Sequence, residues 1–197
     1  MTKLSNHPYF LWALLSLPAI PMIAGLASGD PATIHKLLHP SGEFAARFLI
    51  ITLMITPLAM LLKGWRGPRW LMKRRRYFGV AAFGYSALHT LLYLIDEGAV
   101  ALAASELAKL YIWTGWVAFL IFVPLAFTST DGWVRRLGTR WKTLQRLAYA
   151  AAIFTLIHWA ALHDWGGLAP ALVHFAPLTA LQLYRFYAVS RRRRAVS

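Results

Sequence analysis

The chain of 197 residues is 58% hydrophobic and 14% charged, against about 45–50% apolar and about 25% charged residues in a typical soluble domain. This balance excludes a water-soluble globular protein, and the absence of cysteine excludes disulfides, thiolate-bound metals and iron–sulfur clusters. The net charge of +14 would suit a nucleic-acid-binding protein, but the cations stand in short clusters between apolar runs. The sequence therefore predicts a membrane protein.

Six apolar runs reach the length of about 20 residues that a spanning helix needs. In chain order we expect spans near residues 9–27, 44–62, 78–95, 111–128, 144–162 and 168–189. Lys3 is the only charged residue before the first run and no cleavable signal peptide is evident, so we expect this run to stay in the bilayer. Short connections predict one all-α domain over residues 1–197, a polytopic six-helix transmembrane bundle.

Lysine and arginine gather in alternate loops. They fill the second loop, KGWRGPRWLMKRRR, and the fourth, STDGWVRRLGTRWK, and the C-terminal tail adds Arg185 and Arg191 to Arg194. With six spans these segments lie on one side, which the positive-inside rule makes cytoplasmic, so both termini are expected in the cytoplasm. Six of the seven acids fall on the other side: Asp30, Glu43, Asp96, Glu97, Glu106 and Asp164. We interpret the basic runs mainly as topology signals, with binding of anionic lipid as a second possibility.

Two histidines interrupt the apolar runs: His89 in FGYSALHTLLYLI on the third span and His158 in AAIFTLIHWAAL on the fifth. Both spans run outward, and each histidine comes a few residues before an outer acid, so the two rings are expected at nearly the same depth. Two neutral imidazoles on facing helices at one depth are the axial ligands that a bis-histidine haem needs. Small neighbours would leave room for a porphyrin: Gly84, Ser86, Ala87, Ala151, Ala152, Ala160 and Ala161.

Each histidine taken alone could instead make a simple hydrogen bond between helices. His174 on the sixth span comes to a similar depth and is an alternative haem ligand, although we favour a polar contact for it. His163 is expected at the outer mouth as a solvated residue. His7, His35 and His39 are given no role.

With histidines on the third and fifth spans, the chain resembles the ferric-reductase-like transmembrane domain. The stretch LAFTSTDGWVRRLGTRWKTLQRLAYAAAIFTLIHW is similar to the MsrQ (YedZ) family, the haem-binding membrane subunits of the bacterial methionine sulfoxide reductase system. Two more stretches agree, SGEFAARFLIITLMITPLAMLL and RRRYFGVAAFGYSALHTLLYL, so the resemblance covers nearly the whole chain.

The resemblance implies a multi-pass protein of the bacterial inner membrane that holds haem b, which we expect at one per chain, between His89 and His158. It implies a redox subunit rather than the catalytic subunit. Electrons would come from a cytoplasmic flavin reductase that uses NAD(P)H, or from membrane quinol. They would pass to a periplasmic molybdopterin enzyme, MsrP, which reduces oxidised methionine in proteins, and FMN is associated with the family.

The family motif RWxxLHxLxY has a histidine where this chain has Gln145. That position lies about 20 Å along the helix from His158, and glutamine is a poor haem ligand, so a second haem is in doubt. Gln145 could still hydrogen-bond a flavin or quinone in an inner cofactor site. Aromatic and cationic residues of the inner loops would surround it: Trp65, Trp70, Trp133, Trp141, Arg66, Arg69, Arg135, Arg136 and Arg140. An aromatic belt with topology charges explains the same residues without a ligand.

The sequence has no Gly-rich nucleotide-binding fingerprint, so a separate protein is expected to take hydride from NAD(P)H. Two other functions stay open. A stand-alone transmembrane ferric or quinone reductase would have the same bundle residues. A cofactor-free transporter is the less favoured alternative, because we find no convincing internal repeat and the acids lie at the outer edge.

Overall fold

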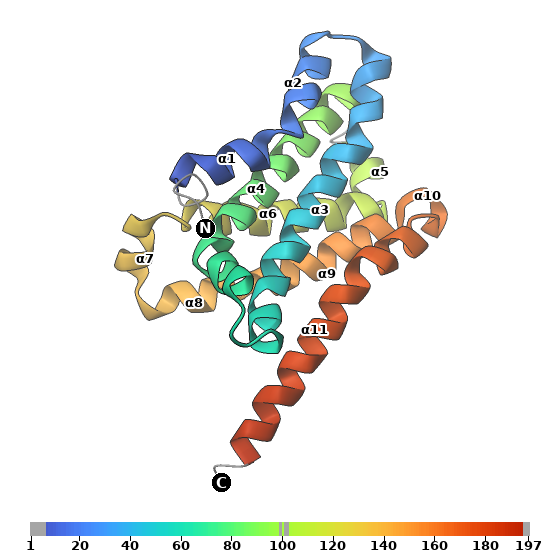
Figure 1. Ribbon diagram of the computed structural model, residues 1–197. Coiled ribbons are helices and arrows are strands. Elements are labelled where there is room, and N and C mark those ends of the chain that lie inside the picture. The colour runs from blue at the N-terminus through green and yellow to red at the C-terminus, as the bar shows by residue number, and fades with distance from the viewer. Residues whose placement is uncertain (1–6, 99, 101–102, 195–197) are drawn as a thin grey trace.

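The computed structural model describes residues 7–98, 100 and 103–194, and Lys3 lies outside this part of the chain. The described residues form helices and no strand, which confirms the all-α prediction (Figure 1). In chain order the helices are α1 (Pro8–Ser16), α2 (Ala19–Ala27), α3 (Pro31–Leu61), α4 (Arg66–Glu97), α5 (Ala104–Leu107), α6 (Leu110–Phe127), α7 (Asp131–Leu137), α8 (Thr139–Gln145), α9 (Leu147–Ala160), α10 (Leu162–Trp165) and α11 (Leu168–Arg194).

Three described helices, α3, α4 and α6, are long and apolar enough to cross a membrane. The first expected span is two helices, α1 and α2, bent by 54° beside Pro18, and the pair adds a fourth crossing if it forms one span. The fifth expected span is reduced to α9, whose 14 residues reach about 21 Å, less than the bilayer hydrocarbon thickness of about 30 Å. The protein is thus a multi-pass membrane protein, and six spans with cytoplasmic termini stay a prediction.

α3 and α4 extend well beyond the apolar runs that predicted them. α3 begins at Pro31, where the Asp30 carboxylate accepts a hydrogen bond from the Thr33 backbone N–H at 3.0 Å and caps the helix. α4 begins at Arg66, so the prediction of a loop through residues 66–76 is wrong. Leucine, methionine, lysine and arginine all favour helix, so the helix continues where hydropathy ends.

The core forms where two helix pairs meet. α3 packs along α4 and α6 packs along α9, and α11 covers both α3 and α9. In Figure 1 the α6–α9 pair runs across the α3–α4 pair. Leu49, Tyr85, Ala151 and Trp159 are buried at this junction, and the small Ala151 side chain lets α9 approach its neighbours closely. This crossing brings the C-terminal half of α4, at His89, close to the C-terminal part of α9, at His158.

The two ends of the bundle carry opposite charge. Near the start of α3, His35 contacts Asp96 at the end of α4 at 2.7 Å, which places these segments at one end. At the other end Arg76, near the start of α4, pairs with Asp131 of α7 at 2.6 Å. We call the first the acidic end, with Asp30, Asp96 and Glu97, and the second the basic end, with Arg75, Arg76, Lys142, Arg146 and Arg185. Cations and acids therefore separate in space as the sequence predicts.

Candidate haem site

The structure brings His89 of α4 and His158 of α9 together. Their ring centroids lie 6.1 Å apart, and the two ring planes are nearly perpendicular at 77°. The two residues are far apart in the chain and come from the two helix pairs that cross in the core. The expected meeting of these two side chains at one depth is therefore present in the fold.

Backbone carbonyl groups determine which nitrogen of each ring carries the proton. His89 Nδ1 lies 3.0 Å from the Leu38 carbonyl oxygen, and His158 Nδ1 bonds the Tyr111 carbonyl oxygen. Because a carbonyl oxygen only accepts, each neutral ring carries its proton on Nδ1 and keeps a lone pair on Nε2. Metal-binding histidines have this arrangement, in which the second nitrogen is held by a backbone or carboxylate oxygen.

Two glycines make room for the rings. A Cβ atom at Gly42 of α3 would lie 3.1 Å from His89 Nδ1 and Cε1, and one at Gly115 of α6 would lie 2.7 Å from His158 Nδ1. Real Cβ atoms essentially never come as close as the second distance. Neither glycine was singled out from the sequence. The one available signal was that Gly115 is the single glycine of the fourth expected span, where glycine costs about 1 kcal/mol relative to alanine.

The donor set fits a haem iron. His89 and His158, with ring centroids 6.1 Å apart, are close enough to hold one metal ion between them. A cavity of about 50 Å³ beside the pair is lined by aromatic side chains, Tyr93, Trp116 and Phe119. This cavity is much smaller than a porphyrin. These side chains must therefore move apart for a macrocycle to enter.

The small residues expected around the histidines have different roles. Ala151, Ala152, Ala160 and Ala161 are buried and allow close helix packing. Gly84 has no heavy atom within 4 Å of a Cβ built on it, so it faces open space. The close contacts to the two rings come from glycines on other helices.

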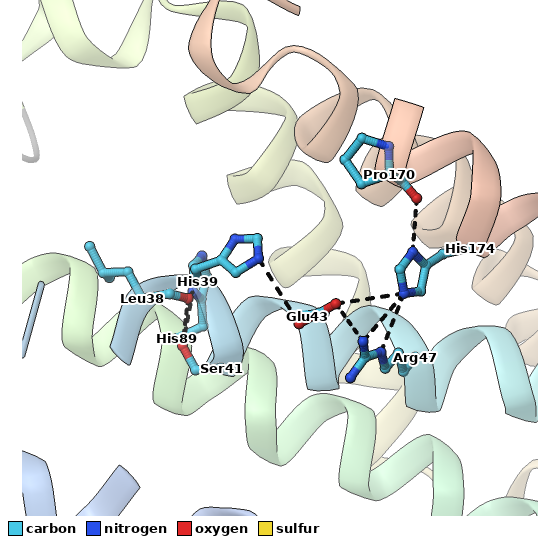
Figure 2. A network of polar contacts seen from close by, with 8 residues as sticks. All are labelled: Leu38, His39, Ser41, Glu43, Arg47, His89, Pro170 and His174. Atoms are coloured by element: carbon cyan, nitrogen blue, oxygen red, sulfur yellow. Dashed lines mark hydrogen bonds and ion pairs between the residues drawn. The ribbon is translucent and has the colours of Figure 1, made fainter. Parts of the chain in front are cut away.

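His174 of α11 belongs to a separate polar cluster (Figure 2). Its Nδ1 donates to the Pro170 carbonyl oxygen at 2.8 Å, and its Nε2 accepts from Arg47 at 3.4 Å. Arg47 is in turn paired with Glu43 one helical turn earlier on α3. The Nε2 lone pair of His174 is thus already used, and the polar contact favoured from the sequence is present. Sequence analysis missed Arg47, although an arginine within an apolar run indicates that it pairs with another polar side chain of the bundle.

The remaining histidines lie toward the acidic end or at the N-terminal end of the described chain. His39 is 4.0 Å from Glu43, and His35 pairs with Asp96. His163 lies in the short α10 with a positive φ of 52°. His7 precedes α1 and contacts Tyr9. None of these four lines the cavity beside His89 and His158.

Gln145 lies at the end of α8, on the basic side of the bundle. Its Nε2 donates to the Leu125 carbonyl oxygen at 3.1 Å and to Thr128 Oγ1 at 3.3 Å. Trp141 donates to the Thr128 carbonyl oxygen at 2.8 Å, and both side chains line a cavity of about 270 Å³. The other aromatic and cationic residues expected there do not line this cavity: Trp65, Trp70, Trp133, Arg66, Arg69, Arg135, Arg136 and Arg140.

Comparison with known proteins places the chain in a family. The family model described as ferric reductase like transmembrane component matches residues 41–156. The MsrQ haem-binding subunit of protein-methionine-sulfoxide reductase from Rhodospirillum rubrum is 37% identical over 91% of this chain and 86% of its own length. The chain belongs to the MsrQ family. The MsrQ protein of Azospira oryzae is 35% identical over 93% of this chain and 79% of its own length.

MsrQ membership confirms the family that the sequence motifs indicated. The matched residues run from α3 to α9 and include His89 and Gln145, while the alignments with whole MsrQ proteins extend over most of the chain. No solved structure matches the chain.

Proposed function

We propose that this protein is a membrane electron-transfer subunit, a single domain over residues 1–197, that binds haem b between His89 and His158. The observation that carries the proposal is the pair of partly buried imidazoles 6.1 Å apart, each with a carbonyl oxygen on Nδ1. His89 and His158 would hold the haem iron through their ring nitrogens, and the haem would supply one-electron transfer when bound. The MsrQ relatives are named as haem-binding subunits, which supports this assignment.

The chain's own residues orient the two ligands. The carbonyl oxygens of Leu38 and Tyr111 hold each Nδ1–H and so leave the lone pair of each Nε2 available to a metal ion. Ser41 lies 3.2 Å from His89 Nδ1 and donates its own hydroxyl to the Leu38 carbonyl oxygen at 2.9 Å, which fixes this part of α3. Apolar surroundings and the hydrogen bonds to the ligands are two means by which a protein tunes a haem potential.

We propose a methionine sulfoxide repair role for these electrons. The names of the MsrQ relatives refer to a protein-methionine-sulfoxide reductase, which supports an acceptor of that kind. The acceptor that we propose is the periplasmic molybdopterin enzyme MsrP, which the family resemblance implies. The bacterial inner membrane is the matching location. The donor is a cytoplasmic flavin reductase or membrane quinol, and FMN is a candidate carrier at the cavity beside Gln145.

A stand-alone ferric or quinone reductase is the second candidate function, favoured by the ferric-reductase description of the matching family. The two functions differ in their acceptor. Reduced protein in nanodiscs should be reoxidised by the purified periplasmic reductase with methionine sulfoxide, and at least about tenfold more slowly by a ferric chelate. The reverse order of rates would favour the stand-alone reductase.

Haem stoichiometry tests the cofactor directly. Protein purified after haem-replete expression should contain about one haem per chain and show the spectrum of a low-spin bis-histidine haem when reduced with dithionite. The variant Gln145→His should raise the ratio toward two. Two haems in the wild-type protein would contradict the single-haem proposal, and no Soret band would contradict the haem proposal itself.

Topology is tested with reporter fusions. A reporter that works only in the cytoplasm should be active when fused after Arg194 or within residues 64–73, because the basic end is expected on that side. The same reporter should be inactive within residues 96–109. The opposite pattern would overturn the proposed orientation.

A further inference from the structure

One buried polar atom beside the two candidate haem ligands has no partner. The hydroxyl oxygen of Tyr93 is buried and makes no hydrogen bond with any described residue. Tyr93 lines the cavity of about 50 Å³ that His89 and His158 also line. Folded proteins rarely leave a buried polar group without a partner, because the loss of its bonds to water costs free energy. The unpaired hydroxyl therefore indicates a ligand that brings a hydrogen-bond acceptor into this cavity.

Two ordinary roles of a membrane tyrosine do not fit Tyr93. A tyrosine of an aromatic belt keeps its hydroxyl in contact with water or lipid headgroups, whereas this hydroxyl oxygen is buried. A tyrosine that joins two helices bonds a group of the second helix. Tyr85 of α4 does so, since its hydroxyl donates to the Leu15 carbonyl oxygen at 2.9 Å. Tyr93 has no equivalent contact in the described part of the chain.

The unpaired hydroxyl marks one side of the cavity as polar. Tyr93 follows His89 by four residues on α4, so it lies about 6 Å farther along the helix, toward the acidic end. The residues of α6 that line the cavity present mainly apolar and aromatic surface: Ile112, Gly115, Trp116 and Phe119. Thr90 also lines the cavity, but its hydroxyl already donates to the Ser86 carbonyl oxygen at 2.9 Å. A ligand with one polar edge thus finds an unused donor at Tyr93.

We propose that the Tyr93 hydroxyl donates a hydrogen bond to a propionate carboxylate of the bound haem and so fixes the orientation of the haem in its site. This inference rests on the proposed haem between His89 and His158. Haem b carries its two propionates on one edge of an otherwise apolar ring. Because a carboxylate is costly to bury without hydrogen-bond donors, the propionate edge faces Tyr93, and the apolar edges face the side chains of α6.

The charges near Tyr93 make a direct donor necessary. Glu97, Glu106 and Lys109 lie close enough to Tyr93 to interact with it electrostatically. Lys109 is paired with Glu106 at 2.7 Å, so these three side chains together leave a net negative charge. A propionate placed here is not attracted by the surrounding charge and needs donors that contact it. A hydrogen bond to an ionised acceptor is about twice as strong as a neutral one, so loss of the Tyr93 hydroxyl has a measurable effect.

The variant Tyr93→Phe removes the hydroxyl and keeps the ring. Haem content should stay near the wild-type value because both axial nitrogens remain, but transfer of haem to excess apomyoglobin should be about tenfold faster. The propionate bands of the resonance Raman spectrum should shift, because they report hydrogen bonding to these carboxylates. In protein expressed without haem, the melting temperature should stay the same or rise, since the change removes an unpaired buried hydroxyl.

Tyr85→Phe is the matched control, because it removes a hydroxyl of the same helix that has its own partner, the Leu15 carbonyl oxygen. It should lower the melting temperature with and without haem and leave the propionate bands unchanged. Propionate bands that are the same in Tyr93→Phe and wild type would overturn this inference and leave the haem proposal standing. Equal destabilisation of haem-free Tyr93→Phe and Tyr85→Phe would reveal a structural bond of Tyr93 and also overturn it. Wild-type protein without haem would overturn both proposals.

Discussion

Replacing His89 or His158 with alanine should lower haem content to below about a tenth of the wild-type value while the protein still inserts in the membrane. Each substitution removes one axial nitrogen, and even the loss of an outer hydrogen-bond partner lowers metal affinity by about 10–100-fold. The apolar helices that drive insertion do not change. The measurement is the ratio of the Soret absorbance to protein, determined on membrane extracts with equal amounts of each variant.

His174→Ala is the matched control for this prediction. It removes an imidazole from the same bundle, but one whose Nδ1 and Nε2 already bond Pro170 and Arg47. Haem content in this variant should stay close to the wild-type value. If His174→Ala lost its haem and His158→Ala kept it, the ligand pair would be His89 and His174, and the proposed site would be wrong.

Gly115→Ala should nearly abolish haem binding although it changes no ligand. The new methyl group would lie 2.7 Å from His158 Nδ1, so the ring has to move away from α6. Overpacking of this kind costs about 1–3 kcal/mol in folding free energy. The movement also breaks the bond from His158 Nδ1 to the Tyr111 carbonyl oxygen, which orients the ligand. Soret absorbance and the melting temperature of the purified variant measure the two effects.

Two further glycine variants are compared with Gly115→Ala, one as a milder change at the other ring and one as a control in open space. Gly42→Ala should lower haem content less, because its Cβ would lie 3.1 Å from the His89 ring, a contact that a small shift can relieve. Gly84→Ala adds the same methyl group to α4 in open space and should leave haem content unchanged. Equal haem loss in Gly84→Ala and Gly115→Ala would show a general packing defect and contradict the specific role of Gly115.

The closeness of His89 and His158 was predictable from the sequence, and the structure places their rings 6.1 Å apart. Residues advance along a helix by about 1.5 Å each, so the distance of His89 and His158 from the acids that follow them gives their relative depth. The same reasoning could not show that His174 is bonded to Arg47, because rotation of α11 about its axis decides which side chain meets α3. The helix ends were also poorly predicted, since α4 begins at Arg66, in a segment that hydropathy places in a loop.

The sequence by itself determined the class of protein, the family and the ligand candidates. The high apolar content excludes a soluble fold. The motifs around Trp141 and His158 that indicate the family each lie within one continuous segment of the chain, so they can be recognised without a structure. Only the tertiary structure decided which surfaces meet. Gly42 and Gly115 lie on helices other than those of the histidines they accommodate, and Arg75 and Arg185, which line the cavity beside Gln145, belong to different helices. Helical periodicity relates a residue to neighbours three or four positions away, whereas contacts between helices depend on how whole side-chain surfaces pack.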